Sequence, residues 1–265
     1  MATLDLKYYM LDWDDNILFM PTLIHLQRDG KPVDVTTKKF AEIRSDKSYE
    51  PLDGSWDKAF KGFRDGTGDF VGDLRKAIES EDYAPSYRAF KTALREARLF
   101  CIVTARDHSA ATIRKGVEEF INLALSDEDR ADMVQNIQKF HALAGLRVAD
   151  DKCLSSYLDH NGYVGVSSPG FLKIFENETD IGMDTGANPE GAKTFAVRKF
   201  VEETIALAKN LPAETRRIAF GFSDDDKRNI AVMREFLESE LVKKYPNIDF
   251  FVYNTSGAET EVEHL

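Results

Sequence analysis

The segment YYMLDWDDNIL, residues 8–18, constrains the fold most, because an apolar run of strand type ends abruptly in carboxylates. Asp12, Asp14 and Asp15 follow the run directly. An apolar strand of this kind is typical of a buried parallel sheet, and the carboxyl ends of such strands border the ligand crevice of α/β proteins. The segment therefore predicts a polar site at the edge of a parallel sheet.

The spacing of the acids suggests what this site can hold. In an extended chain, at roughly 3.3 Å per residue, Asp12 and Asp14 point to the same side about 7 Å apart. They can share a hard cation such as Mg2+, and a carboxylate held in this way can also act as a nucleophile. An acidic turn after a strand is the alternative, since Asp and Asn are ordinary turn residues.

Composition limits the classes of partner. With 265 residues, 43% of them hydrophobic, the chain can form one large α/β domain or a core domain with a smaller insertion. A net charge of -11 argues against nucleic-acid and anionic-membrane binding, so a phosphorylated substrate would need local positive charge or a metal. No apolar run approaches the ~18 residues of a spanning helix, and no signal pattern opens the chain. We expect a soluble, cytoplasmic protein with no membrane partner.

Two later apolar runs also end in polar residues. The run 99–103 leads to Thr104 and Arg106, and the run RRIAFGF, residues 216–222, leads to the acids 224–226. Helical patterns alternate with these runs, which favours a mainly parallel sheet whose strand ends share one edge. The alternative for Thr104, and for Ser223 or Asp224, is that the side chain caps the helix that follows. Arg106 has two alternatives of its own: it binds a substrate phosphate, or it pairs with Asp107.

The segment between the first two runs has a different character. In residues 18–84, Asp29-Gly30 is a hairpin turn signal, and the glycines of the run GFRDGTGD, residues 62–69, are expected to act as loop hinges. We predict that residues 18–84 form a cap or flap inserted after the first strand, and that residues 1–17 and 85–265 form the core. Within the core, residues 126–144 form an acidic stretch of helical pattern, and the region from there to about 187 is less regular, with one short β-rich run at 163–166.

Four motifs in chain order resemble those of the haloacid dehalogenase superfamily. They are DWDDN at 12–16, VTARD at 103–107, GAK at 191–193 and FSDDDKRN at 222–229. The resemblance covers about 160 residues of the core. It implies a three-layer Rossmann-like fold with an inserted cap and a phosphatase that works through an aspartyl-phosphate.

The resemblance also assigns roles to residues. It implies that Asp12 is the nucleophile and Asp14 the general acid and base, while Thr104 and Lys193 hold the transferring phosphoryl group. Lys193 also stands out by itself, because a lysine in the first turn of a helix opposes the helix dipole and is better explained by a paired or ligand-facing role. We expect Arg106 to contact the substrate.

The implied cofactor is Mg2+, bound by Asp12, by the backbone carbonyl of Asp14, and by Asp224 or Asp225. Three consecutive aspartates leave the register open, and Asp224 with Asp225 is favoured because they come first after the strand. The family's small residue and threonine after the second aspartate are replaced by Asp15-Asn16. Asn16 can still donate a hydrogen bond to substrate through its amide.

Other functions fit the same motifs. A phosphotransferase or a nucleic-acid-end phosphatase would use them with a different acceptor or cap, although low basicity disfavours the latter. A catalytically silent Mg2+-binding or regulatory protein would keep the acids but has no need for Asp14 or Lys193. A phospho-receiver module would be shorter and would carry its motifs in another order. A small phosphorylated substrate is the partner we expect.

Overall fold

The computed structural model describes residues 4–143, 145, 147–178, 189–209 and 216–265. Six strands form one sheet in the order β6-β5-β1-β7-β8-β9, in which all neighbours are parallel except β8 and β9. The bounds in this order are β6 (Gly162–Gly165), β5 (Phe100–Thr104), β1 (Leu4–Leu11), β7 (Arg216–Asp224), β8 (Ile248–Asn254) and β9 (Glu261–His264). The predicted α/β class and mainly parallel sheet are confirmed.

The register brings the polar strand ends to the same level. Leu11, the last residue of β1, lies opposite Ile102 of β5 and Ser223 of β7. The residues that follow these positions in each strand therefore leave the sheet at one edge, as parallel strands must. This edge gathers the three motifs that are far apart in the sequence.

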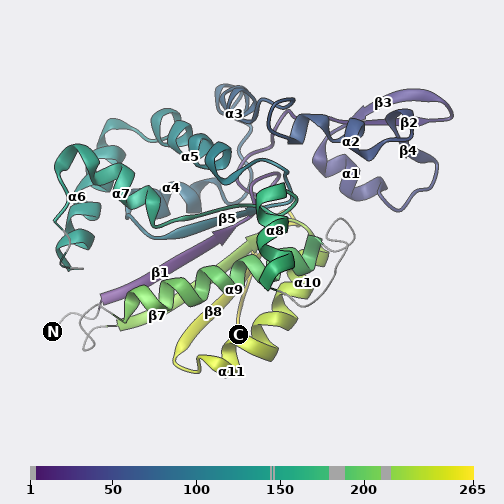
Figure 1. Ribbon diagram of the computed structural model, residues 1–265. Coiled ribbons are helices and arrows are strands. Elements are labelled where there is room, and N and C mark those ends of the chain that lie inside the picture. Colours follow the sequence, from purple (N-terminus) through teal and green to yellow (C-terminus); the bar gives the residue numbers. More distant parts are fainter. Residues whose placement is uncertain (1–3, 144, 146, 179–188, 210–215) are drawn as a thin grey trace.

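Helices flank the sheet on both sides (Figure 1). The group drawn in blue to teal comprises α3 (Phe70–Glu79), α4 (Tyr87–Arg95), α5 (Ala110–Ala124), α6 (Asp127–Leu143) and α7 (Cys153–Asp159). The green and yellow group comprises α8 (Pro169–Glu178), α9 (Pro189–Ala208), α10 (Lys227–Phe236), a π-helical turn at Leu237–Leu241 and α11 (Val242–Lys244). None of the helices in the described residues has both the length and the apolar character that a bilayer span requires.

Several local expectations are corrected. In the region 126–187, α6 and β6 confirm the helical stretch and the β-rich run, whereas α7 and α8 lie in the part whose pattern was less regular. Strand β9 was not anticipated, and its residues offer only a short, exposed, alternating pattern. Ser109 caps α5 and Asp226 caps α10 through side-chain oxygens that accept backbone N–H groups, so neither Thr104 nor Ser223 nor Asp224 has the capping role.

A small antiparallel sheet lies beyond the carboxyl ends of the core strands (Figure 1). It contains β2 (Ile24–Arg28), β3 (Lys31–Val35) and β4 (Tyr49–Pro51), with α1 (Thr37–Ile43) and α2 (Trp56–Ala59) beside it. The predicted hairpin is confirmed: Asp29 and Gly30 have φ values of 51° and 70°, as a tight two-residue turn of mirror-image type requires. We call residues 24–63 the insertion unit.

The insertion unit has its own hydrophobic cluster, whose buried members are Ile24, Leu26, Val35, Ile43, Ala59 and Phe63. Helix α3 lies outside it, because Phe70, Leu74 and Ala77 pack into the large cluster of the main sheet. Leu18 and Met20 also belong to that large cluster. The part of segment 18–84 that stands apart from the main core is therefore only 24–63.

The glycine-rich run 62–69 is anchored rather than free. The Asp107 amide donates to the Phe63 carbonyl at 3.0 Å, and the Ser109 amide donates to the Asp65 carboxylate at 3.0 Å. A Cβ at Gly68 would lie 2.1 Å from the Gly62 carbonyl oxygen, so the run folds tightly on itself. The predicted loop hinges are wrong for this stretch, since its backbone is tied to the loop after β5.

Candidate active site

The loop after β1 is shaped by one large buried side chain. Trp13 is fully buried and meets the rings of Phe70, Phe90 and Phe120 edge-on, at centroid distances of 5.2–6.3 Å. Its carbonyl accepts the backbone amide of Ile17, which closes the loop. With Trp13 directed into the core, the acids on either side of it are directed to the sheet edge.

Lys193 of α9 lies between two of these acids. Its ammonium is 2.7 Å from Oδ2 of Asp224 and 3.4 Å from Oδ1 of Asp12, and all three residues are buried. Burial by itself would lower the pKa of Lys193, but the two carboxylates outweigh it and raise the pKa above its usual value. The predicted proximity of Asp12, Lys193 and Asp224 is present in the structure.

Asp12, Asp224 and Asp225 form a candidate metal centre. One carboxylate oxygen of each residue lies within 4.8 Å of the others. Burial raises the pKa of Asp12 well above its usual range, with Lys193 opposing and Asp224 adding to the effect. Burial and Asp224 likewise raise the pKa of Asp225 to about 8. The single ammonium of Lys193 therefore does not balance the negative charge of the three carboxylates.

The donor chemistry fits a hard divalent cation. Oδ1 of Asp12 is buried and accepts no hydrogen bond from the described residues. Asp224 is instead fully engaged, since it accepts from Lys193, from the Asn229 amide and from the backbone of Asp226. A free oxygen in an all-carboxylate set suits Mg2+, which prefers oxygen ligands.

Asp14 takes part in a different pair. Arg106 donates to both of its carboxylate oxygens, from Nε at 2.7 Å and from Nη2 at 2.6 Å. Nη2 also donates to Thr22, whose hydroxyl donates to Asp73 at 2.7 Å. The predicted pair of Arg106 with Asp107 is wrong: Arg106 is 1% exposed and paired with Asp14, while Asp107 pairs with Arg64 at 3.2 Å. Contact of Arg106 with a substrate stays a prediction.

Two further predicted residues are buried in the framework. Thr104, 1% exposed at the end of β5, accepts the Arg106 amide at 3.4 Å. Asn16, 0% exposed, donates to the carbonyls of Asp12 and Ser223. Its side-chain oxygen accepts hydroxyl hydrogens from Ser86, Ser223 and Thr255. Asn16 is therefore not available to substrate, because both amide hydrogens bind backbone.

A cleft of about 430 Å³ opens beside the candidate metal centre, between α1 of the insertion unit and the core. Asp225 lines both the cleft and the centre. Asp15, which also lines the cleft, has φ of 56°, and burial raises its pKa to about 6 although the Thr37 hydroxyl opposes this. The insertion unit thus forms one wall of a cavity whose other wall carries the acids.

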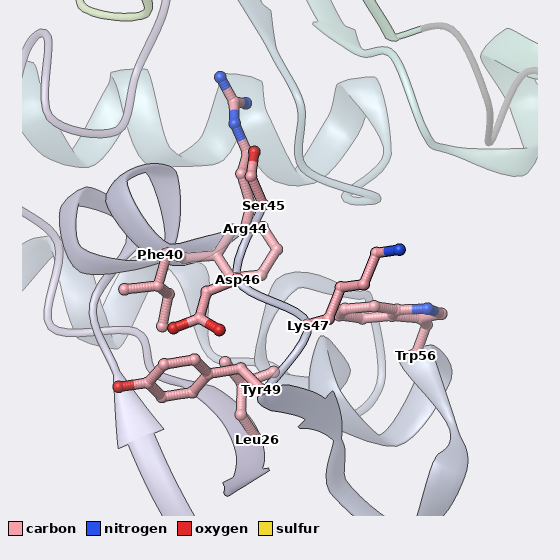
Figure 2. Close-up of a pocket in the computed structure, with 9 residues that line it drawn as sticks. Leu26, Phe40, Arg44, Ser45, Asp46, Lys47, Tyr49 and Trp56 are labelled. Carbon is pink, nitrogen blue, oxygen red and sulfur yellow. The ribbon is translucent and has the colours of Figure 1, made fainter.

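A second hollow, of about 190 Å³, lies on the insertion unit itself (Figure 2). Phe40, Tyr49 and Trp56 contribute aromatic surface to it. Figure 2 shows the Arg44 side chain extending away from the Tyr49 ring, and Arg44 makes a 2.8 Å ion pair with Asp226 of the core. This hollow contains none of the predicted site residues.

Sequence reasoning missed the residues that support the site. Thr22 and Asp73 continue the Arg106 pair, and Lys38 and Arg228 line the cleft. No local motif could have identified Thr22 and Asp73, because they act through contacts with residues distant in the chain. Lys227 and Arg228 had a usable signal, since basic residues in the first turn of a helix oppose the helix dipole.

No protein-family model, curated protein or solved structure matches this chain.

Proposed function

We propose that the protein is a Mg2+-dependent phosphatase that hydrolyses small phosphate monoesters through an aspartyl-phosphate on Asp12. The observation that carries the proposal is the buried Oδ1 of Asp12, which has no hydrogen-bond donor and lies 3.4 Å from the Lys193 ammonium within an acidic triad. A nucleophilic carboxylate needs a free oxygen and positive charge beside it to approach an anionic phosphate. The resemblance of the four motifs to the haloacid dehalogenase superfamily supports the same assignment.

In the first step an oxygen of Asp12 bonds to phosphorus as the bond from phosphorus to the leaving oxygen breaks. Asp12, Asp224 and Asp225 would hold Mg2+, which neutralises repulsion between the nucleophile and the phosphate. Lys193 would stabilise charge on the phosphoryl oxygens. Thr104 would support the phosphoryl site from the end of β5.

Asp14 would donate a proton to the leaving oxygen and then take a proton from the water that attacks the aspartyl-phosphate. That second attack breaks the bond between Asp12 and phosphorus and releases inorganic phosphate. Both oxygens of Asp14 accept from Arg106, so Asp14 must exchange one of these bonds for the substrate or the water. Arg106 is thus proposed to orient Asp14, with Thr22 and Asp73 fixing the guanidinium.

The test compares the wild-type protein with Asp12→Asn and with Asp132→Asn, a matched change at an exposed position of α6. We expect Mg2+-dependent release of phosphate from an aryl phosphate by the wild type and by Asp132→Asn, and none by Asp12→Asn, because an amide is a poor nucleophile. Acid quenching during turnover should trap phosphate on a peptide containing Asp12. Turnover by purified Asp12→Asn would refute the nucleophile assignment.

A further inference from the structure

The cleft beside the candidate metal centre has the size of a small-molecule site. Its volume of about 430 Å³ lies within the roughly 300–1,000 Å³ common for ligand pockets. Asp225 lies at the end shared with the acidic triad. A phosphate placed at that triad would therefore direct the remainder of its ester into the cleft.

Basic side chains from two separate elements converge on this cleft. Lys38 comes from α1 of the insertion unit, and Lys227 and Arg228 come from the first turn of α10. In the described part of the chain no salt bridge forms to any of the three; Arg228 reaches only the Ser45 hydroxyl, at 3.5 Å. The cleft thus offers three cations that form no ion pair among the described residues, in a protein with a net charge of -11.

Four acids also line the cleft, Asp15, Glu42, Asp225 and Asp226, and the last three of them are engaged with other groups. Asp226 pairs with Arg44 at 2.8 Å, and Glu42 pairs with Lys39 at 2.8 Å. Asp225 belongs to the triad. The positive side chains on the two walls thus retain their charge for a ligand.

Helix stability does not explain the two basic residues of α10. The positive end of a helix dipole favours acids in the first turn and disfavours Lys and Arg there. Asp226 caps this helix and satisfies the dipole, yet Lys227 and Arg228 follow it directly and line the cleft. An anion in the cleft would be attracted by both side chains and by the helix end.

We infer that the cleft binds a second anionic group of the substrate. The substrates would be phosphate monoesters whose leaving group carries a carboxylate or a second phosphate. Lys38, Lys227 and Arg228 would determine this specificity, and the insertion unit would contribute to it through α1. The inference rests on the proposed function, because it places the scissile phosphate at the acidic triad.

The first experiment measures kcat/KM on two matched pairs of esters. One pair is 3-phosphoglycerate and glycerol 3-phosphate; the other is fructose 1,6-bisphosphate and fructose 6-phosphate. We expect the more anionic member of at least one pair to be preferred about tenfold or more, which corresponds to about 1.4 kcal/mol, the scale of one charge-assisted hydrogen bond. A preference within the first pair identifies a carboxylate as the second anion, and a preference within the second pair identifies a phosphate. High salt should reduce the preference, because it screens the charges.

The variants Lys227→Met and Arg228→Met should each lower this preference several-fold. Lys31→Met, an exposed change in the hairpin of the insertion unit, is the matched control and should leave the preference as in the wild type. Equal kcat/KM within both pairs, a preference for the less anionic ester, or a preference that both cleft variants retain would overturn the inference.

A binding experiment distinguishes failure of this inference from failure of the proposed function. Calorimetry with the Asp12→Asn protein and Mg2+ compares the dissociation constants of the same esters without turnover. The inference is supported if the more anionic esters bind more tightly and if Arg228→Met abolishes this difference. This result would support the anion site even if the wild type hydrolysed none of the esters. If both members of each pair bind equally while the wild type hydrolyses them measurably, the proposed phosphatase function stands and the anion site is refuted.

Discussion

The core and the insertion unit differ in how their charges are held. In the core, the Lys193 and Asp224 side chains are 2% and 0% exposed, and the sheet and α9 fix both of them. Where the insertion unit meets the core, the ion pair of Arg44 and Asp226 is 26% and 20% exposed. A buried charge that loses its partner is costly, whereas an exposed pair contributes little.

The hydrophobic packing differs in the same direction. The insertion unit relies on six buried residues around a three-stranded sheet, while the core wall is supported by the large cluster that includes Trp13 and Phe70. A small cluster gives limited stability to a separate unit. We therefore expect the proposed chemistry to depend on the core, and substrate choice to depend on both walls of the cleft, through Lys38 of α1 and through Lys227 and Arg228 of α10.

The largest effect is expected from deletions that test where the two regions meet. Residues Thr22 and Gly62 lie side by side, since a Cβ at Gly62 would be 3.0 Å from Cγ2 of Thr22. Replacing 24–61 with a short glycine linker should therefore leave a folded core that hydrolyses a small aryl phosphate with weaker discrimination between esters. Replacing 18–84 should unfold the protein, because Phe70, Leu74 and Ala77 are lost from the main cluster.

Circular dichroism and thermal melts of both deletion proteins provide the measurement. A folded core after removal of 18–84 would show that α3 is dispensable. A folded but inactive protein after removal of 24–61 would show that the insertion unit supplies catalytic chemistry, and the proposed division of labour would fail.

The next effect is the loss of the buried ammonium. Lys193→Met leaves Asp12 and Asp224 without their cation, so the free energy of unfolding should fall by about 3–5 kcal/mol in urea titrations without metal. Lys115→Met, at an exposed position of α5, should change it by less than about 0.5 kcal/mol. Adding Asp224→Asn to Lys193→Met should recover part of the loss. A loss below about 1 kcal/mol would contradict the buried arrangement.

A smaller effect concerns pH. The folded-state pKa of Asp225, about 8, lies above the unfolded value of about 3.9, so the folded protein binds the proton more tightly. Its contribution to stability is complete below the unfolded value and is lost as pH rises through 8. Without metal, the Tm of Asp225→Asn should exceed that of the wild type by an amount that grows from pH 5 to pH 8.

Mg2+ should counteract this trend. A cation that binds only the folded protein raises the Tm, so the gain at pH 8 should be larger in the wild type than in Asp225→Asn. A Tm difference between the two proteins that stays constant from pH 5 to pH 8 would argue against repulsion in the triad.

The smallest effect is expected at the ion pair that links the two walls. Arg44→Ala should reduce the free energy of unfolding by less than about 1 kcal/mol, because the pair is partly exposed. Lys58→Ala, which removes an exposed pair with Asp53 inside the insertion unit, is the control for stability. Only Arg44→Ala should alter the KM for esters that fill the cleft. An equal KM change in both variants would show that the link to Asp226 does not shape the cleft.

Local pattern was sufficient for much of the fold. Apolar runs predicted β1, β5 and β7, and alternation with helices predicted a parallel sheet, since the strand and helix periods can be read directly from the residues. The hairpin at Asp29-Gly30 followed from turn chemistry. The region after α6 was harder, because the short helices α7 and α8 depend on packing more than on local preference.

The sequence by itself determined the set of groups at the sheet edge. Asp12 and Asp224 come together because parallel strands of matching register end at one level, a consequence of strand order that does not depend on detailed packing. Lys193 reaches both of them from the first turn of α9. Tertiary structure decided which of these groups pair: Arg106 with Asp14 rather than with Asp107. It also decided that the Asn16 side chain donates to the backbone carbonyls of Asp12 and Ser223, and that residues of α1 and α10 line the cleft. Pairing is settled by distances between elements far apart in the chain, and such distances leave no local pattern.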